Sequence, residues 1–126
     1  MKKTITLIVI FLMATVIFAQ SPSGVIEVSA KKLSQDFQNN QIRAENLYKG
    51  KALKITGIFY RIFSINNIYY LDIEGTDIYY SIRVNFKNSE INKIADFDRG
   101  QTITIIGRCD GFGNPEVTIK DAYVVN

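Results

Sequence analysis

Residue types that commonly carry catalysis are scarce in this sequence. The chain contains no histidine, which excludes Ser–His and Cys–His nucleophilic arrangements. Its single cysteine, Cys109, falls on the inward side of a predicted strand and has no evident base. We therefore expect Cys109 to be a small buried hydrophobe, with a reactive or intermolecular thiol as the alternative. The sequence predicts no catalytic residue and no enzymatic activity.

Three acidic residues form the only pattern that resembles a metal site. Asp72, Glu74 and Asp77 cluster around a glycine in a predicted turn. Carboxylate oxygens of this kind can bind calcium, but the spacing matches no calcium-binding loop. Acidic residues in turns are usually solvated, so we predict no metal site and no cofactor.

Aromatic, arginine and amide side chains give better support for ligand binding. They recur at alternate positions of two predicted strands, which places them on one outer surface. The candidate ligand-binding residues are Tyr70, Asp72, Tyr79, Ser81, Arg83 and Asn85, with Phe112 from a flanking loop. Such a face could stack a nucleic-acid base, worth about 1–3 kcal/mol per base, or hold a sugar. Alternatively, Tyr70 and Tyr79 pack on each other across the strands or against the N-terminal helix.

A change of hydrophobic period shows which elements position these residues. Apolar residues three and four apart predict helical structure over residues 25–48, with Ser29 as the N-cap and Gly50 as the stop. From Lys51 the period becomes two, which predicts strands. The expected strands cover residues 51–63, 69–73, 78–86, 103–109 and 117–125, with a short helix at 88–97. One side of the last strand is expected to carry Val117, Ile119, Asp121, Tyr123 and Val125.

This order predicts a mainly β fold: a five-stranded OB-fold barrel (β-β-β-α-β-β) with an N-terminal helix. Gly57, in the middle of the long first strand, is expected to allow a bend or bulge. The short helix is expected to close the barrel bottom through Ile91, Ile94 and Phe97. OB barrels bind ligands on the face of strands two and three, where most of the candidate residues lie.

The N-terminus predicts export. Lys2 and Lys3 precede an uncharged apolar run from Thr4 to Ala19, as in a signal peptide. The predicted organisation is a signal peptide at 1–19, a linker at 20–28 and an OB-fold domain with its N-terminal helix at 29–126. We expect a periplasmic or secreted protein with no membrane span after cleavage; an uncleaved N-terminal anchor is the alternative.

The charge of the chain argues against a large nucleic-acid footprint. Lysine and arginine number 15 against 12 acidic residues. Removing Lys2 and Lys3 leaves 13 against 12, a net charge of +1. Nucleic-acid-binding domains usually show a strongly basic face, which this balance does not supply.

Several phrases together resemble the tRNA_anti-like family of OB-fold lipoproteins and exported proteins. The phrases cover residues 44–51, 54–57, 100–111 and 117–121, with sequences AENLYKGK, KITG, GQTITIIGRCDG and VTIKD. The resemblance implies an OB fold and an envelope location, and it implies little about activity. Members often carry a lipid-modified cysteine after the signal and a second cysteine late in the last strand. This chain has neither, and Ala122 stands at the latter position, which puts a disulfide of Cys109 in doubt.

Together these features predict an exported OB-fold binding module. Its expected ligand is an oligosaccharide, a peptide or another small ligand of the cell envelope. A protein-interaction or structural module of the envelope is the alternative, with an envelope protein as partner. Binding of single-stranded nucleic acid is the less favoured alternative, because of the charge and the expected location.

Overall fold

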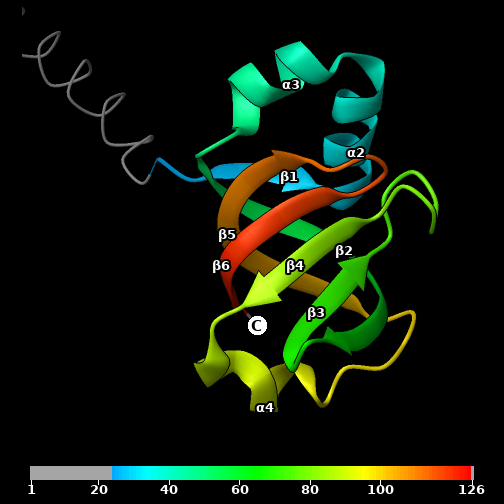
Figure 1. Ribbon diagram of the computed structural model, residues 1–126, viewed down its shortest axis with the longest axis vertical. Helices are drawn as coiled ribbons and strands as arrows, with labels where there is room; N and C mark the ends of the chain where they lie inside the picture. Colours follow the sequence, from blue (N-terminus) through cyan, green and yellow to red (C-terminus); the bar gives the residue numbers. More distant parts are fainter. Residues whose placement is uncertain (1–23, 126) are drawn as a thin grey trace, which may run out of the picture.

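The computed structural model describes residues 24–125 and shows a mainly β chain with two helices at one end (Figure 1). The strands are β1 (Ile26–Ser29), β2 (Ala52–Ile65), β3 (Ile68–Ile73), β4 (Ile82–Phe86), β5 (Thr102–Phe112) and β6 (Val117–Val124). The helices are α2 (Ala30–Asn39), α3 (Gln41–Tyr48), the 3-10 turn η1 (Asn88–Glu90) and α4 (Ile91–Ile94). The signal peptide predicted at residues 1–19 lies outside the described residues.

The strands form one six-stranded sheet in the order β1-β2-β3-β4-β6-β5. An additional pairing between β2 and β5 closes a circuit of five strands, with β1 attached parallel to β2. Strand β2 serves both halves of this circuit, because residues 52–58 pair with β5 and residues 59–65 pair with β3. The predicted order of strands with a short helix after the third is therefore confirmed, but the predicted count of five strands is wrong, because β1 adds a sixth strand to the sheet.

Gly57 lies where β2 passes from one partner to the other. A Cβ atom at this position would lie 2.5 Å from Ile73 Cγ2 and 2.6 Å from Ala30 Cβ. Glycine is therefore required by close packing between the strand and α2. The register of β2 against β3 shifts between Phe59 and Arg61, so a bulge follows Gly57 closely, in line with the predicted irregularity.

The predicted start of the N-terminal helix at residue 25 is wrong. Residues Ile26–Ser29 form β1, paired parallel with residues 53–56 of β2, so part of the predicted linker 20–28 belongs to the sheet. The helix begins at Ala30, and Ser29 is its N-cap as predicted, with Oγ accepting a hydrogen bond from Lys32 N at 3.1 Å. Asn40 then ends α2 and caps α3 by accepting from Arg43 N, because its side chain supplies the acceptor that a helix start needs.

The third predicted strand also begins too early, because residues 78–81 lie in a loop and β4 starts at Ile82. Asp77 holds this loop: its Oδ1 accepts from Tyr79 N and Tyr80 N, each at 2.9 Å. An aspartate that bonds its own following backbone favours a turn over a strand. The apolar residues Ile78 and Tyr80 therefore did not report strand structure, whereas the alternation from Ile82 to Phe86 did.

The inward side of the last strand changes along its length. Val117 and Ile119 are buried, but Asp121 is exposed and has a φ of 51°. Ala122 and Val124 are buried after it, whereas Tyr123 and Val125 are exposed. One residue in the left-handed region inserts an extra position into the strand and reverses the alternation. The prediction that Asp121, Tyr123 and Val125 share one side of the strand with Val117 and Ile119 is therefore wrong.

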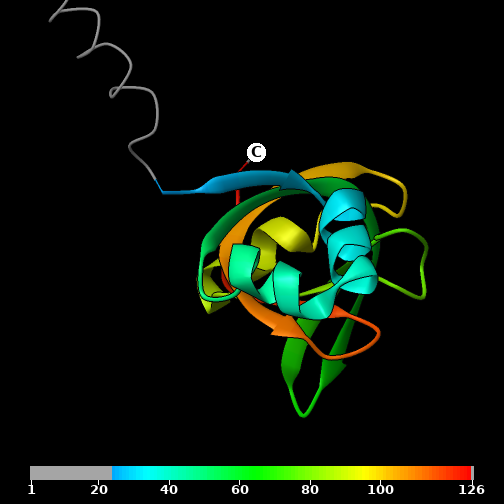
Figure 2. The same ribbon diagram turned by 90° about the horizontal axis from the view of Figure 1, so that it is seen from above.

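The apolar core lies inside the circuit of strands and is closed at both ends. At one end α2 and α3 lie across the strands (Figure 2), with Leu33 and Phe37 buried. At the other end Ile94 is buried, and Phe97 packs on Phe59 with ring centroids 5.8 Å apart. This confirms the role predicted for the short helix region at residues 88–97.

Candidate functional site: the outer face of β2, β3 and β4

A two-residue turn builds the outer face of the hairpin formed by β2 and β3. Asn66 and Asn67 have φ values of 52° and 65°, a combination typical of the tight turns that join hairpin strands. The turn sets the register of the hairpin, so that residues of β2 and β3 lie directly opposite each other, and residues of β4 lie opposite the same residues of β3. The resulting cross-strand face comprises Arg61 and Phe63 of β2, Tyr70 and Asp72 of β3, and Arg83 and Asn85 of β4.

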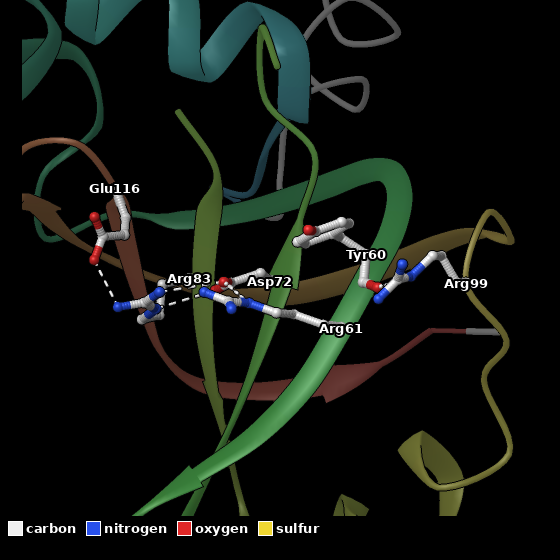
Figure 3. Close-up of polar contacts among 6 residues, drawn as sticks. All are labelled: Tyr60, Arg61, Asp72, Arg83, Arg99 and Glu116. Carbon is white, nitrogen blue, oxygen red and sulfur yellow. Dashed lines mark hydrogen bonds and ion pairs between the residues drawn. The ribbon is translucent and has the colours of Figure 1, made fainter. Parts of the chain in front are cut away.

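Asp72 is the centre of an arginine–carboxylate network on this face (Figure 3). Its side chain is only 2% exposed and accepts from Arg61 Nε at 3.0 Å. Arg83 binds it through two nitrogens, Nε at 3.0 Å and Nη2 at 3.2 Å, and donates Nη1 to Glu116 Oε1 at 2.6 Å. The hydrogen bond to Asp72 raises the pKa of Arg83 although burial opposes it. The network contains two arginines and two carboxylates, so its charges balance.

Aromatic rings lie directly beside the network. Phe63 and Tyr70 face each other across β2 and β3, with centroids 5.8 Å apart and planes at 24°. The guanidinium carbons of Arg61 and Arg83 each lie 4.8 Å from the Phe63 centroid. Cation–π contacts at this distance are favourable, so the arginines are oriented by both the carboxylate and the ring. The face consequently presents flat apolar and flat polar groups side by side.

A second arginine–aromatic contact extends the face along β2. Tyr60 lies at the β2 bulge, and its carbonyl accepts from Arg99 Nε at 3.1 Å. The Arg99 guanidinium carbon lies 4.9 Å from the Tyr60 ring centroid (Figure 3). Among the described residues, no acidic side chain forms an ion pair with Arg99. This flank therefore adds one uncompensated positive charge to the balanced network.

The structure brings four of the predicted ligand-binding residues together: Tyr70, Asp72, Arg83 and Asn85. Asp72 is on the outer face as expected, but the two arginines cover it. Tyr79 and Ser81 were predicted to lie on the third strand, but they precede β4. Whether these residues contact a ligand stays a prediction.

The other three predicted residues have different surroundings. Tyr79 is 65% exposed in the loop before β4 and touches Tyr80 edge-on, whereas Ser81 is buried. Phe112 ends β5 and stacks on Phe37 of α2, with centroids 5.7 Å apart. The alternative pairing of Tyr70 with Tyr79 is not formed, because Tyr70 stacks on Phe63 and pairs with Asn85.

Three members of the cross-strand face and its ion-pair network were missed from the sequence: Arg61, Phe63 and Glu116. A signal for the first two was present. A two-residue turn at Asn66-Asn67 pairs residues symmetrically outward from it, which places Phe63 opposite Tyr70 and Arg61 opposite Asp72. Glu116 reaches Arg83 through the β5–β6 connection, and no local pattern indicates such a contact.

The described residues also bear on catalysis and metal binding. Within residues 24–125, no three histidine, cysteine or acidic side chains come together as metal ligands. Cys109 is 1% exposed, and burial raises the pKa of its thiol, which favours the unreactive protonated form. No helix in this part of the chain is both long and apolar enough to cross a bilayer.

Comparison with known proteins identifies the fold and the family. A Klebsiella pneumoniae protein, named a putative nucleic acid-binding lipoprotein, superimposes with a TM-score of 0.62 at 22% identity, over 81% of this chain and 92% of that chain. This likeness shows a shared, OB-like fold. A structure of yeast Stn1 and Ten1 is more distant, with a TM-score of 0.48 at 14% identity, over 85% of this chain and 66% of that chain.

Sequence comparison gives a more direct assignment than these structural likenesses. A search of curated protein sequences finds no match. The profile of the family described as tRNA_anti-like matches residues 1–123, nearly the whole chain. The chain therefore belongs to the tRNA_anti-like family.

Proposed function

We propose that this chain is an exported OB-type binding module whose circuit of five strands acts as a barrel. In this proposal the cross-strand face of β2, β3 and β4 is the ligand site, and the preferred ligand is an oligosaccharide. Four of its six residues lie on β3 and β4, the second and third strands of the circuit, and OB barrels commonly bind ligands on the face of these strands.

The observation that carries the proposal is the balanced network beside the two stacked rings. Asp72 and Glu116 neutralise Arg61 and Arg83, so the face has little net attraction for a polyanion. Its groups are nonetheless strong, oriented donors and acceptors. A ring such as Tyr70 offers a flat apolar surface next to them. A neutral, hydroxyl-rich oligomer matches this combination.

Arg61 is the member of the network best placed to contact a ligand. Its side chain is 48% exposed, whereas that of Arg83 is 23% exposed and held at three nitrogens. Within the described residues, only Nε of Arg61 donates a hydrogen bond. Since a guanidinium carries five N–H donors, most donors of Arg61 remain available to hydroxyl oxygens.

The Arg99–Tyr60 flank supports a second candidate function, binding of single-stranded nucleic acid. With Arg99 included, three arginines face two carboxylates, a net charge of +1. Alternating guanidinium groups and rings can track a strand through phosphate contacts and base stacking. The similar Klebsiella protein carries a nucleic-acid-binding name, which raises the same possibility for this chain.

NMR titration of the isotope-labelled protein separates these functions. The panel contains neutral trisaccharides, a short peptide and an oligothymidylate, each added at low and moderate salt. Saturable shifts at Arg61, Phe63 and Tyr70 with a trisaccharide, insensitive to salt, would support the first proposal. Nucleic-acid binding would instead weaken with salt, with log K falling by about 0.7 per log unit of salt for each phosphate neutralised.

Matched variants locate the binding. Tyr70→Ala removes a ring from the face, whereas Tyr69→Ala removes a neighbouring ring that is 49% exposed and alternates to the other side of β3. Arg61→Ala is matched by Arg108→Ala, since Arg108 is similarly exposed and also ion-paired. If the variants of each pair bind equally well, the cross-strand face is not the ligand site. Binding by no member of the panel would favour the protein-interaction alternative.

A further inference from the structure

A hollow lies at the helix-covered end of the strands, and none of Arg61, Asp72 and Arg83 lines it. It is a groove of about 410 Å³, formed by the junction of α2 and α3, by Tyr80 before β4, and by the β5–β6 connection. A volume of this size falls within the usual range for small-ligand sites, about 300–1,000 Å³. We call it the amide groove, after the side chains that line it.

Contacts between distant segments hold the walls of the amide groove in place. The rings of Phe37 and Phe112 stack with centroids 5.7 Å apart and planes at 23°, which joins α2 to the end of β5. Ser34 Oγ donates to the Tyr80 carbonyl at 3.0 Å, which joins α2 to the loop before β4. The groove is therefore formed without a ligand, and binding would not have to order its walls.

The lining is rich in carboxamides and carries no formal charge. Five of its eight residues are amides: Gln38, Asn39, Asn40, Gln41 and Asn114. The other three are the rings of Phe37, Tyr80 and Phe112. Neither lysine nor arginine lines the groove to hold a phosphate, and no carboxylate lines it to hold a cation. The lining thus suits a neutral ligand that both donates and accepts hydrogen bonds.

The contacts of these amides leave both kinds of group available. Gln38 donates Nε2 to Thr76 Oγ1 at 2.8 Å, so its carbonyl oxygen remains as an acceptor. Asn40 Oδ1 accepts from Arg43 N at 3.0 Å, so its NH₂ group remains as a donor. Within residues 24–125, the side chains of Asn39 and Asn114 form no hydrogen bond to protein. The groove therefore offers hydrogen-bond donors and acceptors, and the fold sets the orientation of the Gln38 and Asn40 side chains.

We propose that the amide groove is a saccharide-binding site that takes one neutral sugar unit. Sugar hydroxyls donate and accept hydrogen bonds as carboxamides do, and the half-buried rings of Tyr80 and Phe112 provide flat apolar surface for the carbon–hydrogen face of a sugar ring. The site goes beyond the function proposed for the cross-strand face, because it requires no ligand there.

The test is an NMR titration of the labelled protein with maltotriose, cellotriose and tri-N-acetylchitotriose. We expect one of them to shift the amides of Asn39, Gln41 and Asn114 saturably. The double variant Asn39→Ala/Asn114→Gly should weaken that binding about tenfold, because two hydrogen-bonding side chains are lost. Glycine is used at Asn114 because its φ of 35° disfavours other residues. Asn92→Ala, an exposed change at the α4 end, is the matched control and should bind normally.

Two results would overturn the proposal: no saturable shift in the groove with any of the three trisaccharides, or equal affinity of the double variant and the wild type. The same titration keeps the two proposals apart. Shifts confined to Arg61, Phe63 and Tyr70 would support the cross-strand face alone. Shifts confined to the amide groove, unaffected by Tyr70→Ala, would support the groove alone.

Discussion

Replacing Asp72 by asparagine tests whether the arginine–carboxylate network stabilises the fold. The carboxylate accepts one hydrogen bond from Arg61 and two from Arg83 while its side chain is 2% exposed. Asparagine has nearly the same shape but only one acceptor oxygen. In either orientation its NH₂ group would face a guanidinium N–H, and at least one buried hydrogen bond would be lost.

The contacts set the size of the expected effect. Breaking a buried ion pair by removing one partner costs about 3–5 kcal/mol. The loss is smaller here, because Arg61 is 48% exposed and can be rehydrated and Arg83 keeps Glu116. Exposed pairs contribute only about 0.2–1 kcal/mol. We therefore expect the free energy of unfolding to fall by roughly 2–4 kcal/mol and the melting temperature by roughly 10–20 °C.

Urea and thermal unfolding, followed by circular dichroism because the chain has no tryptophan, measures the change. Asp110→Asn is the matched control. Asp110 pairs with Lys120 at 3.1 Å, and both side chains are more than 40% exposed, so its loss should cost less than about 1 kcal/mol. If Asp72→Asn destabilises the protein no more than Asp110→Asn does, the network contributes no net stability and the reasoning is refuted.

Three further predictions concern backbone packing, turn geometry and pH. Gly57→Ala should lower the unfolding free energy measured in urea titrations by about 1–3 kcal/mol, because the new Cβ has no room. The control is Gly113→Ala, whose Cβ would meet nothing closer than 3.7 Å. This change should alter the unfolding free energy by less than about 0.5 kcal/mol. Asn67→Gly should raise the same free energy by roughly 0.5 kcal/mol, since its φ of 65° is easier for glycine, and a decrease would contradict this. Burial and the hydrogen bond to Asp36 raise the pKa of Tyr48 to about 12, above its value in the unfolded chain. The free energy of unfolding should therefore fall as pH rises from about 10 to about 12. In Tyr48→Phe, denaturation curves measured across this range should show a smaller fall. If the unfolding free energy of the variant depends on pH as steeply as that of the wild type, Tyr48 is not the group responsible.

The alternation of apolar residues was informative wherever a strand is buried on one side. Leu71 and Ile73 are buried as their spacing predicted, because burial of one face is what produces a period of two. Alternation failed at Asp121, where a single residue with positive φ reverses the inward side. It failed again at Tyr79, where hydrogen bonds to the Asp77 carboxylate hold a turn. Both exceptions depend on backbone conformation, which a hydrophobic pattern does not report.

Four of the six residues of the cross-strand face were accessible from local patterns, and the two on β2 were not. Tyr70, Asp72, Arg83 and Asn85 follow from alternation along their strands. Their neighbours on β2 follow only once the register of the hairpin is known, because register decides which side chains face each other.

By itself, the sequence determined the mainly β class, the order of the strands and the short helix, and the burial of Cys109. These depend on local spacing, on turn residues and on the number of apolar positions. Only the tertiary structure decided that Arg61, Asp72, Arg83 and Glu116 form one charge-balanced network, and that α2, the loop before β4 and the β5–β6 connection enclose a groove of uncharged amides. Both arrangements join residues far apart in the chain, and their contacts exist only after the strands have paired and the helices have packed.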